Sequence, residues 1–233
     1  MALGLSTGSG GGDIKPFVKY DAKAGRLFRA DRVQNPDGTF ASETHEITGV
    51  AQMAMDLANI RVGWINYTTQ GPVRKLVVLG REAIPPRPDD KNSEGKPAFK
   101  QGFEVDLILN KDSGGGPVRV LGSAAGCVIE AMDVLHDAYS TAAESKAGKL
   151  PVVRISGVNP VKSGQSTNYK PTFSIVAWID RPQALTGAPA TAAPVQAAPP
   201  APGATVVSPP QQQATPQQAT PQQAAMADLS DFG

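Results

Sequence analysis

The charged and aromatic residues of this chain stop abruptly near residue 182, and this boundary limits what the chain can fold into. All 22 Lys and Arg residues lie at or before Arg181, and every aromatic residue except Phe232 lies at or before Trp178. Residues 183–227 carry no charge and consist largely of Ala, Pro and Gln. Such a stretch cannot bury enough apolar surface to offset the entropy of ordering it. We therefore expect a disordered linker there.

The same boundary predicts four regions. Residues 1–13 are rich in Gly and Ser and are expected to form a flexible arm, residues 14–182 form one domain, residues 183–227 form the linker, and residues 228–233 form an acidic tip. Residues 1–182 hold 22 basic and 19 acidic side chains, which gives a charge of +3. A mildly basic body with an acidic end favours a polyanionic ligand.

Several classes of protein are disfavoured by composition. The single cysteine, Cys127, excludes an internal disulfide and a Cys-based zinc site. The first residues lack the features of a signal peptide, and no apolar run approaches the roughly 18 residues of a membrane span. His45 and His136 are isolated from any catalytic or metal-binding arrangement. We expect a soluble cytosolic protein that is not an enzyme and needs no cofactor or metal.

Short apolar or alternating segments recur between residues 17 and 179, with turn residues between them, and this rhythm is typical of β structure. The predicted fold class is mainly β with one helix, an OB-fold-like small barrel with additions. A β-sandwich with one helix fits nearly as well. Turns or loops are expected at 35–38, 84–96 and 112–116. Strands are predicted over residues 17–20, 26–30, 46–51, 59–68, 74–79, 102–109, 118–121, 152–158 and 172–179.

One amphipathic helix is predicted over residues 123–145. Its apolar residues fall on one face at helical spacing, and this face should pack on the sheet. The acidic residues Glu130, Asp133, Asp137 and Glu144 form a stripe on the opposite face, where they would repel phosphate. A nucleic-acid surface must therefore lie elsewhere. The apolar face comprises Val128, Ile129, Met132, Leu135, Tyr139 and Ala142.

Binding of single strands needs cations along the backbone and aromatic rings that stack on bases. In the last predicted strand, alternation places Phe173 in the core and Trp178 on the other face, so Trp178 is a candidate. In the strand over 59–68, Tyr67 shares a face with Arg61 and is the better candidate for stacking. Trp64 lies on the opposite face and fits burial better, although it is kept as a candidate.

Two further segments interleave cations with rings. Residues 161–171 are predicted to form a loop in which Lys162, Tyr169 and Lys170 clamp a phosphodiester chain, and a solvated hairpin loop is equally compatible. Residues 15–20 place Phe17 and Lys19 on one side of a strand and Tyr20 on the other. Further candidate cations are Arg74, Lys75, Arg81, Lys96, Lys100 and Arg154.

The C-terminal tip combines two acids with two apolar residues. A linker of about 45 residues would span on the order of 35–40 Å, so the tip could lie far from the domain. A basic-rimmed apolar pocket of a partner protein would capture this combination, and a frayed chain end is the alternative. The candidate residues are Asp228, Leu229, Asp231 and Phe232.

Body, Pro/Gln-rich linker and acidic tip together resemble the bacterial and phage single-stranded DNA-binding proteins. The phage and prophage members are similar through GGGDIKPFVKY at 10–20, NIRVGW at 59–64, FKQGF at 99–103, GVNP at 157–160 and IDRP at 179–182. The resemblance implies an oligonucleotide-binding barrel that coats single-stranded DNA in replication, recombination and repair, within the host cytoplasm if a phage encodes it. It also implies a tail that recruits replication and recombination proteins.

This chain departs from the bacterial tail, which is more acidic and ends on Pro-Phe, because Gly233 follows Phe232 here. The partner of the tip, the oligomeric state and a preference for DNA over RNA stay open at this point. The main alternative is a non-enzymatic virion or assembly protein, for which a β-rich body and a low-complexity tail are equally ordinary.

Overall fold

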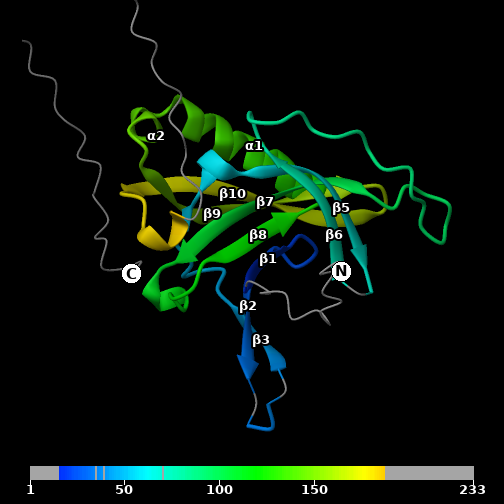
Figure 1. The fold of residues 1–233 in the computed structure, drawn as a ribbon, viewed down its shortest axis with the longest axis horizontal. Helices are drawn as coiled ribbons and strands as arrows, with labels where there is room; N and C mark the ends of the chain where they lie inside the picture. Colours follow the sequence, from blue (N-terminus) through cyan, green and yellow to red (C-terminus); the bar gives the residue numbers. More distant parts are fainter. Residues whose placement is uncertain (1–15, 35, 39, 70, 187–233) are drawn as a thin grey trace, which may run out of the picture.

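The computed structural model describes residues 16–34, 36–38, 40–69 and 71–186 (Figure 1). The predicted arm and acidic tip lie outside these residues, as does the linker from residue 187 onward. The described part consists mainly of strands, with one main helix and a mixed sheet. The mainly β fold class with one helix is therefore confirmed.

Among the described residues, the fold has ten strands and two helices, together with three short 3₁₀ helices at Leu57–Asn59, Lys111–Ser113 and Gln183–Leu185. The helices are α1 (Gly126–Thr141) and α2 (Ala143–Lys146). The strands are β1 (Phe17–Asp21), β2 (Arg26–Gln34), β3 (Phe40–Glu46), β4 (Met53–Met55), β5 (Arg61–Thr68), β6 (Gly71–Val78), β7 (Lys100–Leu109), β8 (Arg119–Ser123), β9 (Leu150–Ser163) and β10 (Ser166–Ile179).

The strands form one sheet in the order β10-β9-β4-β7-β8-β1-β2-β3. Strand β7 is central because β5 pairs with its first half, β4 with its last residues and β8 with its other edge. Strand β6 extends the sheet beyond β5. Strands β1 and β8 are parallel, and the other described pairs are antiparallel. The described pairings leave β3, β6 and β10 with one neighbour each, so they do not include a pair that would close a barrel.

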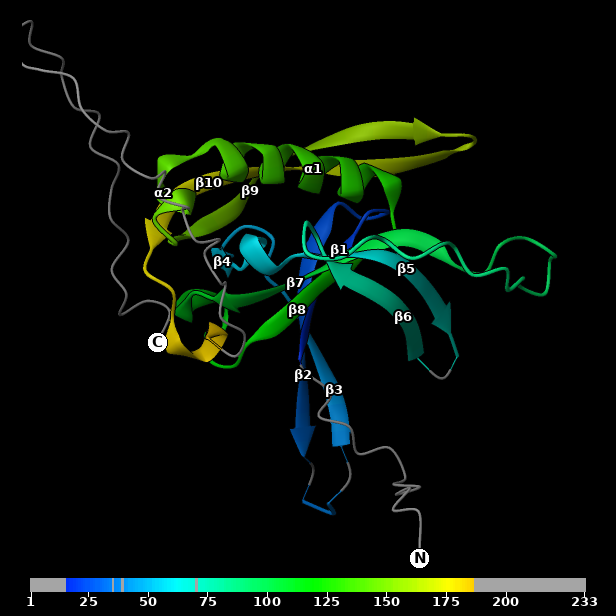
Figure 2. The ribbon, with the colours of Figure 1, turned by 45° about the horizontal axis from the view of Figure 1, so that its top comes forward.

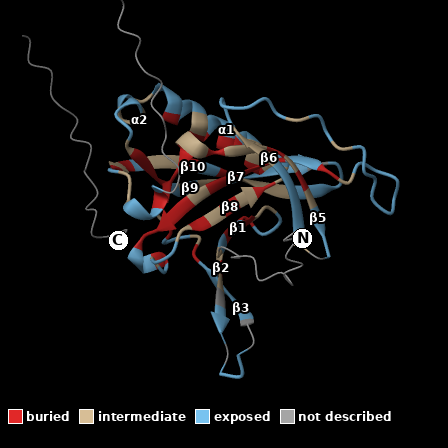
Figure 3. Cartoon of the chain, in the orientation of Figure 1, coloured by how far each residue is buried: buried red, intermediate tan, exposed pale blue. Residues whose placement is uncertain are grey.

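Helix α1 lies across one face of the central strands, and the main core fills the space between them (Figures 2 and 3). The predicted apolar face of the helix is confirmed: Val128, Met132, Leu135 and Tyr139 are buried, and Ile129 packs against the same core. Burial of such side chains supplies about 1.5–3 kcal/mol each. Core residues from the sheet include Val18, Leu27, Phe103, Val105, Leu107, Leu121 and Phe173.

The single predicted helix over 123–145 is interrupted at Ala142, whose backbone is extended with φ −70° and ψ 145°. The side chains of Ser140 and Thr141 both bond to the carbonyl oxygen of Asp137. Such hydroxyl groups compete with the helical hydrogen bonds of the backbone. The helix therefore ends earlier than apolar periodicity predicts.

The prediction of a strand over 46–51 is wrong, because Glu46 is the last residue of the observed strand. Strand β3 covers Phe40–Glu46, and residues 48–50 form a turn that buries Ile47 and Ala51. Residues 41–46 are all exposed, so no alternation marked them in the sequence. Strand β4 was also missed, since three consecutive buried residues of the types Met and Ala carry no β signal.

The loop predicted over 161–171 is also wrong. Strands β9 and β10 continue through most of it, and the turn consists of residues 164 and 165. Pro160 and Pro171 lie within these strands. Proline is tolerated on such strands where its missing N–H faces outward from the ladder. The result is a long hairpin that projects past the rest of the sheet (Figure 2).

The folded part extends beyond residue 182. Leu185 is buried in a second apolar cluster with β4, β9 and β10. Arg181 donates two hydrogen bonds of 2.7 Å to the carboxylate of Asp56, which is buried, and a third to the carbonyl oxygen of Leu185. The prediction of a disordered linker is therefore wrong for residues 183–186. The side chain of Leu185, in an otherwise low-complexity sequence, packs into this apolar cluster.

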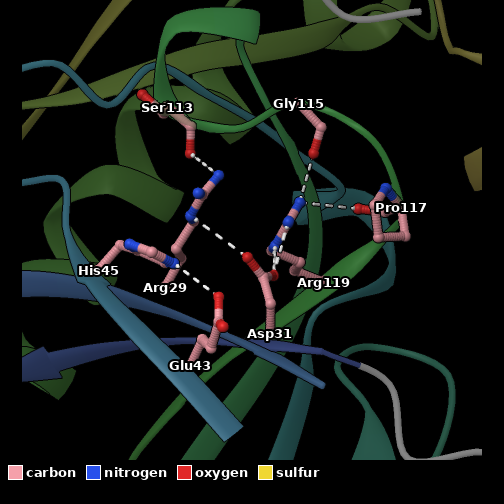
Figure 4. A network of polar contacts seen from close by, with 8 residues as sticks. All are labelled: Arg29, Asp31, Glu43, His45, Ser113, Gly115, Pro117 and Arg119. Atoms are coloured by element: carbon pink, nitrogen blue, oxygen red, sulfur yellow. Dashed lines mark hydrogen bonds and ion pairs between the residues drawn. The ribbon is translucent and has the colours of Figure 1, made fainter. Parts of the chain in front are cut away.

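The loop predicted over 112–116 joins β7 to β8 and is held by two arginines (Figure 4). Arg29 of β2 donates to the carbonyl oxygen of Ser113, and Arg119 of β8 donates to that of Gly115. Both guanidinium groups also contact Asp31, at 3.3 and 2.8 Å. This network fastens the base of the β2–β3 hairpin to the end of the sheet.

Candidate nucleic-acid interface

The sheet has one face that α1 covers and one that it does not. The side chains of Ile60, just before β5, and Val62 on β5 pack toward the core, so Arg61, Gly63, Ile65 and Tyr67 lie on the other face. We call this second face of strands β6, β5, β7, β8, β1 and β2 the open face. The register adds further residues to it, namely Arg74 on β6, Lys100, Glu104 and Asp106 on β7, Phe17, Lys19 and Asp21 on β1, and Phe28 and Ala30 on β2.

The open face contains a hollow of about 310 Å³ over β1, β2 and β3. Its lining consists of Phe17, Lys19, Asp21, Phe28, Ala30 and Thr44, and we call it the β1–β2 hollow. Strand β1 lies two strands from β7 through β8. The spacing of neighbouring strands places it about 10 Å from β7. The hollow and the β5–β7 residues therefore lie on the same face of the sheet.

Two aromatic rings on the open face are available to a ligand. Tyr67 is 60% exposed and Phe17 is 45% exposed, which is unusual for rings of this size. Phe28, half-buried beside Lys19, is a third ring on this surface. Phe28 was not a predicted candidate, although its alternation with the buried Leu27 was a signal that could have identified it. The predicted candidates Phe17 and Tyr67 do share a face.

The cations of the open face differ in their partners. Arg61 lies 2.7 Å from Asp106 and 3.8 Å from Glu104, and Arg74 also pairs with Glu104. Lys19 and Lys100 are exposed and make no ion pair among the described residues. The paired arginines neutralise the two carboxylates in the middle of the face. The two lysines therefore supply its unpaired positive charge.

The charges of the molecule are segregated by element. The β5–β6 hairpin (61–78) and the β9–β10 hairpin (150–179) hold six Lys and Arg residues and no Asp or Glu. Helix α1 holds three acids and no Lys or Arg. Both hairpins project from the same end of the molecule (Figures 1 and 2). A polyanion would be attracted to that end and repelled by the helix.

Tyr20 was a predicted candidate, but its ring is buried in the core. The hydroxyl group donates a 3.0 Å hydrogen bond to the carbonyl oxygen of Tyr169. Burial, followed by the charges of Cys127 and Asp21, raises the pKa of Tyr20 to about 12. A ring in this position cannot stack on a base, so Tyr20 connects β1 to the β9–β10 hairpin instead.

Trp64 and Lys75 lie on the opposite face of the β5–β6 hairpin from Arg61 and Tyr67. The indole N–H of Trp64 donates a 2.7 Å hydrogen bond to the carbonyl oxygen of Pro85, and Arg87 lies over its ring. The ammonium group of Lys75 lies 5.6 Å from the ring centroid of Phe99. The long loop over 79–99 therefore contacts Trp64, which is half-buried.

Trp178 does not lie where alternation placed it. The register between β10 and β9 shifts at Val176, which is the extra residue of a β-bulge. Trp178 consequently packs against the same core as Phe173, and its ring stacks on Tyr139 at a centroid distance of 6.0 Å. The prediction that Trp178 lies opposite Phe173 is wrong, because a bulge reverses the alternation.

The remaining candidate cations are spread over the β9–β10 hairpin and one turn. Lys170 forms a 2.9 Å ion pair with Glu130 of α1, whereas Arg154 and Lys162 are exposed. Arg81 bonds to the side-chain oxygen of Asn59. Tyr169 is half-buried, and its backbone N–H donates to the carbonyl oxygen of Ala22. None of these residues belongs to the open face.

A second hollow lies between α1 and the edge of β5 and β7. It has a volume of about 430 Å³ and an apolar floor that includes Val62, Phe103 and Met132. Its rim carries Asp133 and Asp137, and His136 lies beside them. We call it the helix cleft. Two carboxylates on its rim make it unsuitable for phosphate.

The described residues contain no group of three or more His, Cys, Asp and Glu side chains that could hold a metal ion. No helix in this part of the chain has the length and apolar character needed to cross a membrane. Comparison with protein-family models, with curated proteins and with solved structures gives no significant match for this chain.

Proposed function

We propose that this chain is a single-stranded DNA-binding protein that coats DNA through the open face. The observation that carries the proposal is the exposure of Phe17 and Tyr67 on one sheet face, beside Lys19 and Lys100. Rings for stacking and cations for phosphates are the two elements that binding of single strands requires.

The mechanism is association without bond cleavage. Each base stacked on an aromatic ring contributes about 1–3 kcal/mol, and each phosphate that meets a lysine releases condensed counterions. Because stacking needs an unpaired base, the open face favours single strands over duplexes. A coated strand stays unpaired and is shielded from nucleases.

The proposal extends to the segments outside the described residues. The acidic tip with Asp228, Asp231 and Phe232 would recruit replication and recombination proteins, in keeping with the resemblance noted above. Coating of DNA places the protein in the cytoplasm of the cell in which that DNA replicates. The alternative of a virion or assembly protein gains no specific support from the described surfaces.

Fluorescence anisotropy of a labelled oligo(dT) tests the proposal. We expect binding at about 50 mM salt that weakens steeply toward about 200 mM, because phosphate contacts release counterions. A duplex of the same length should bind far more weakly. Absence of binding at the lower salt concentration, or equal affinity for the duplex, would contradict the proposal.

A further inference from the structure

The β1–β2 hollow has the components of a site for a single base. Phe17 and Phe28 lie on adjacent strands in diagonal positions, since Phe17 pairs with Ala30 and Phe28 pairs with Lys19. Ala30 is buried, and its small side chain lines the hollow together with both rings. An unstacked base is planar and apolar on its faces, and such rings hold it by stacking.

The carboxylate of Asp21 lines this hollow and makes part of its wall negatively charged. Its Oδ1 accepts hydrogen bonds from the backbone N–H groups of Lys23, at 2.8 Å, and Ala24, at 3.2 Å. These bonds lower the pKa of Asp21, so its carboxylate is ionised near neutral pH. Arg26 is the cross-strand neighbour of Asp21, but it bonds to Glu46. Within the described residues, Oδ2 of Asp21 accepts no hydrogen bond.

An ionised carboxylate oxygen accepts hydrogen bonds and cannot donate them. Cytosine, adenine and guanine carry an exocyclic amino group that can donate to it, and carboxylates read cytosine through this group. Thymine has no amino group, and its single N–H donor lies between two carbonyl oxygens that a carboxylate repels. A carboxylate in the wall of the hollow would therefore favour bases that carry an amino group.

We propose that the β1–β2 hollow binds one base of the strand and prefers bases with an exocyclic amino group through Oδ2 of Asp21. The inference rests on the proposed function and specifies which nucleotides that function favours. Phe17 and Phe28 supply the stacking, and Asp21 supplies the preference.

Parallel anisotropy titrations with labelled oligo(dC) and oligo(dT) measure this preference. We expect oligo(dC) to bind about fivefold more tightly, the lower end of what one polar base contact provides. An oligonucleotide of 2-pyrimidinone, which is cytosine without its amino group, should lose this advantage on the unchanged protein. Equal affinity for the three strands would overturn the inference and leave the proposed function intact.

The variant Asp21→Asn gives the sharper test. The amide oxygen of asparagine can keep both turn hydrogen bonds, as asparagine does in turns of this kind. Its amino group then replaces Oδ2 and donates to carbonyl oxygens, so the preference should reverse toward oligo(dT). A dC/dT affinity ratio that stays at its original value in Asp21→Asn would overturn the role of Asp21.

The control variant is Asp133→Asn, which makes the same chemical change on α1 and should keep the original dC/dT ratio. Thermal unfolding of both variants verifies that the fold is retained. Failure of the unchanged protein to bind any of the strands would instead contradict the proposed function.

Discussion

The open face and the helix cleft are both hollowed, and both expose apolar surface, but their charges differ. The open face neutralises Glu104 and Asp106 with Arg61 and Arg74, and it keeps two lysines unpaired against the one carboxylate of Asp21. The helix cleft keeps Asp133 and Asp137 on its rim, and neither carboxylate has a basic partner among the described residues. Charge, more than shape or apolar area, therefore distinguishes the surface that suits a polyanion.

The row of acidic residues on α1 destabilises the helix, and its position in solvent limits this destabilisation. Glu130, Asp133 and Asp137 are three and four residues apart, and like charges at these spacings destabilise a helix by about 0.2–0.5 kcal/mol per pair. The row faces away from the core, where solvent screens it. Under the proposed function, it would also repel phosphate from the helix and leave the open face as the favoured surface.

The largest expected effect comes from removing the rings of the open face. The double variant Phe17→Ala/Tyr67→Ala should weaken binding of oligo(dT) on the order of 100-fold, since each stacked base contributes about 1–3 kcal/mol. Anisotropy titration measures this loss. Both rings are largely exposed, so the fold should tolerate their removal. The control Val134→Ala removes an exposed apolar side chain from α1, and a double variant that binds as tightly as this control would contradict the role of the rings.

A second variant tests whether the buried Tyr20, unlike the exposed Tyr67, contributes to stability and not to DNA binding. Tyr20→Phe removes the hydrogen bond to Tyr169 and should lower the free energy of unfolding by about 1 kcal/mol. Affinity for DNA should not change, because this ring does not belong to the open face. Chemical denaturation and anisotropy give the two values, and a loss of affinity without a loss of stability would contradict the assignment.

The same tyrosine predicts a dependence of stability on pH. The pKa of Tyr20 is about 12 in the folded protein and about 10 when unfolded, so folding favours the neutral phenol. This contribution is complete below pH 10 and decreases as the pH rises through about 12. Denaturation across this range should show a shallower decline in Tyr20→Phe than in the unchanged chain. An equal decline in both proteins would be inconsistent with this pKa.

Smaller effects are expected from single cations. Lys19→Gln and Lys100→Gln should each reduce the slope of log K against log salt by about 0.7, the value for one phosphate contact to a single strand. Lys146→Gln on α2 is the matched control and should leave the slope unchanged. Titrations at several salt concentrations provide the slopes, and three equal slopes would place the phosphates elsewhere.

The smallest effect is expected from the two carboxylates on the rim of the helix cleft. The double variant Asp133→Asn/Asp137→Asn should change the affinity for oligo(dT) less than about twofold at physiological salt, because screening limits charge effects to about 8 Å. Anisotropy titration tests this expectation. A large gain in affinity would mean that the strand passes along the helix cleft, and the comparison between the two surfaces would fail.

Local patterns predicted most of the strands and the helix, because alternation and helical spacing report which side chains are buried. They failed where a strand has no such pattern, as in the fully exposed residues of β3 and the fully buried Met53–Met55 of β4. Pairing with β2, β7 and β9 determines these strands. Long-range pairing of this kind cannot be read from a short window of sequence.

The candidate site was predicted in part for the same reason. Phe17 and Tyr67 were found because alternation holds along β1 and β5. Trp178 was misplaced because the bulge at Val176 reverses alternation, and an inserted residue leaves no signal in residue types. That Phe17 and Tyr67 share one face follows from the order of β5, β7, β8 and β1, which only the folded sheet shows.

Photochemical cross-linking tests the central claim most directly. Irradiation of the protein with a photoreactive oligo(dT), followed by mass spectrometry of the peptides, identifies the residues that contact bases. The proposed interface predicts adducts on Phe17, Phe28 or Tyr67 and none on α1. Adducts confined to His136, Tyr139 or other residues of α1, or no adducts at all, would contradict it.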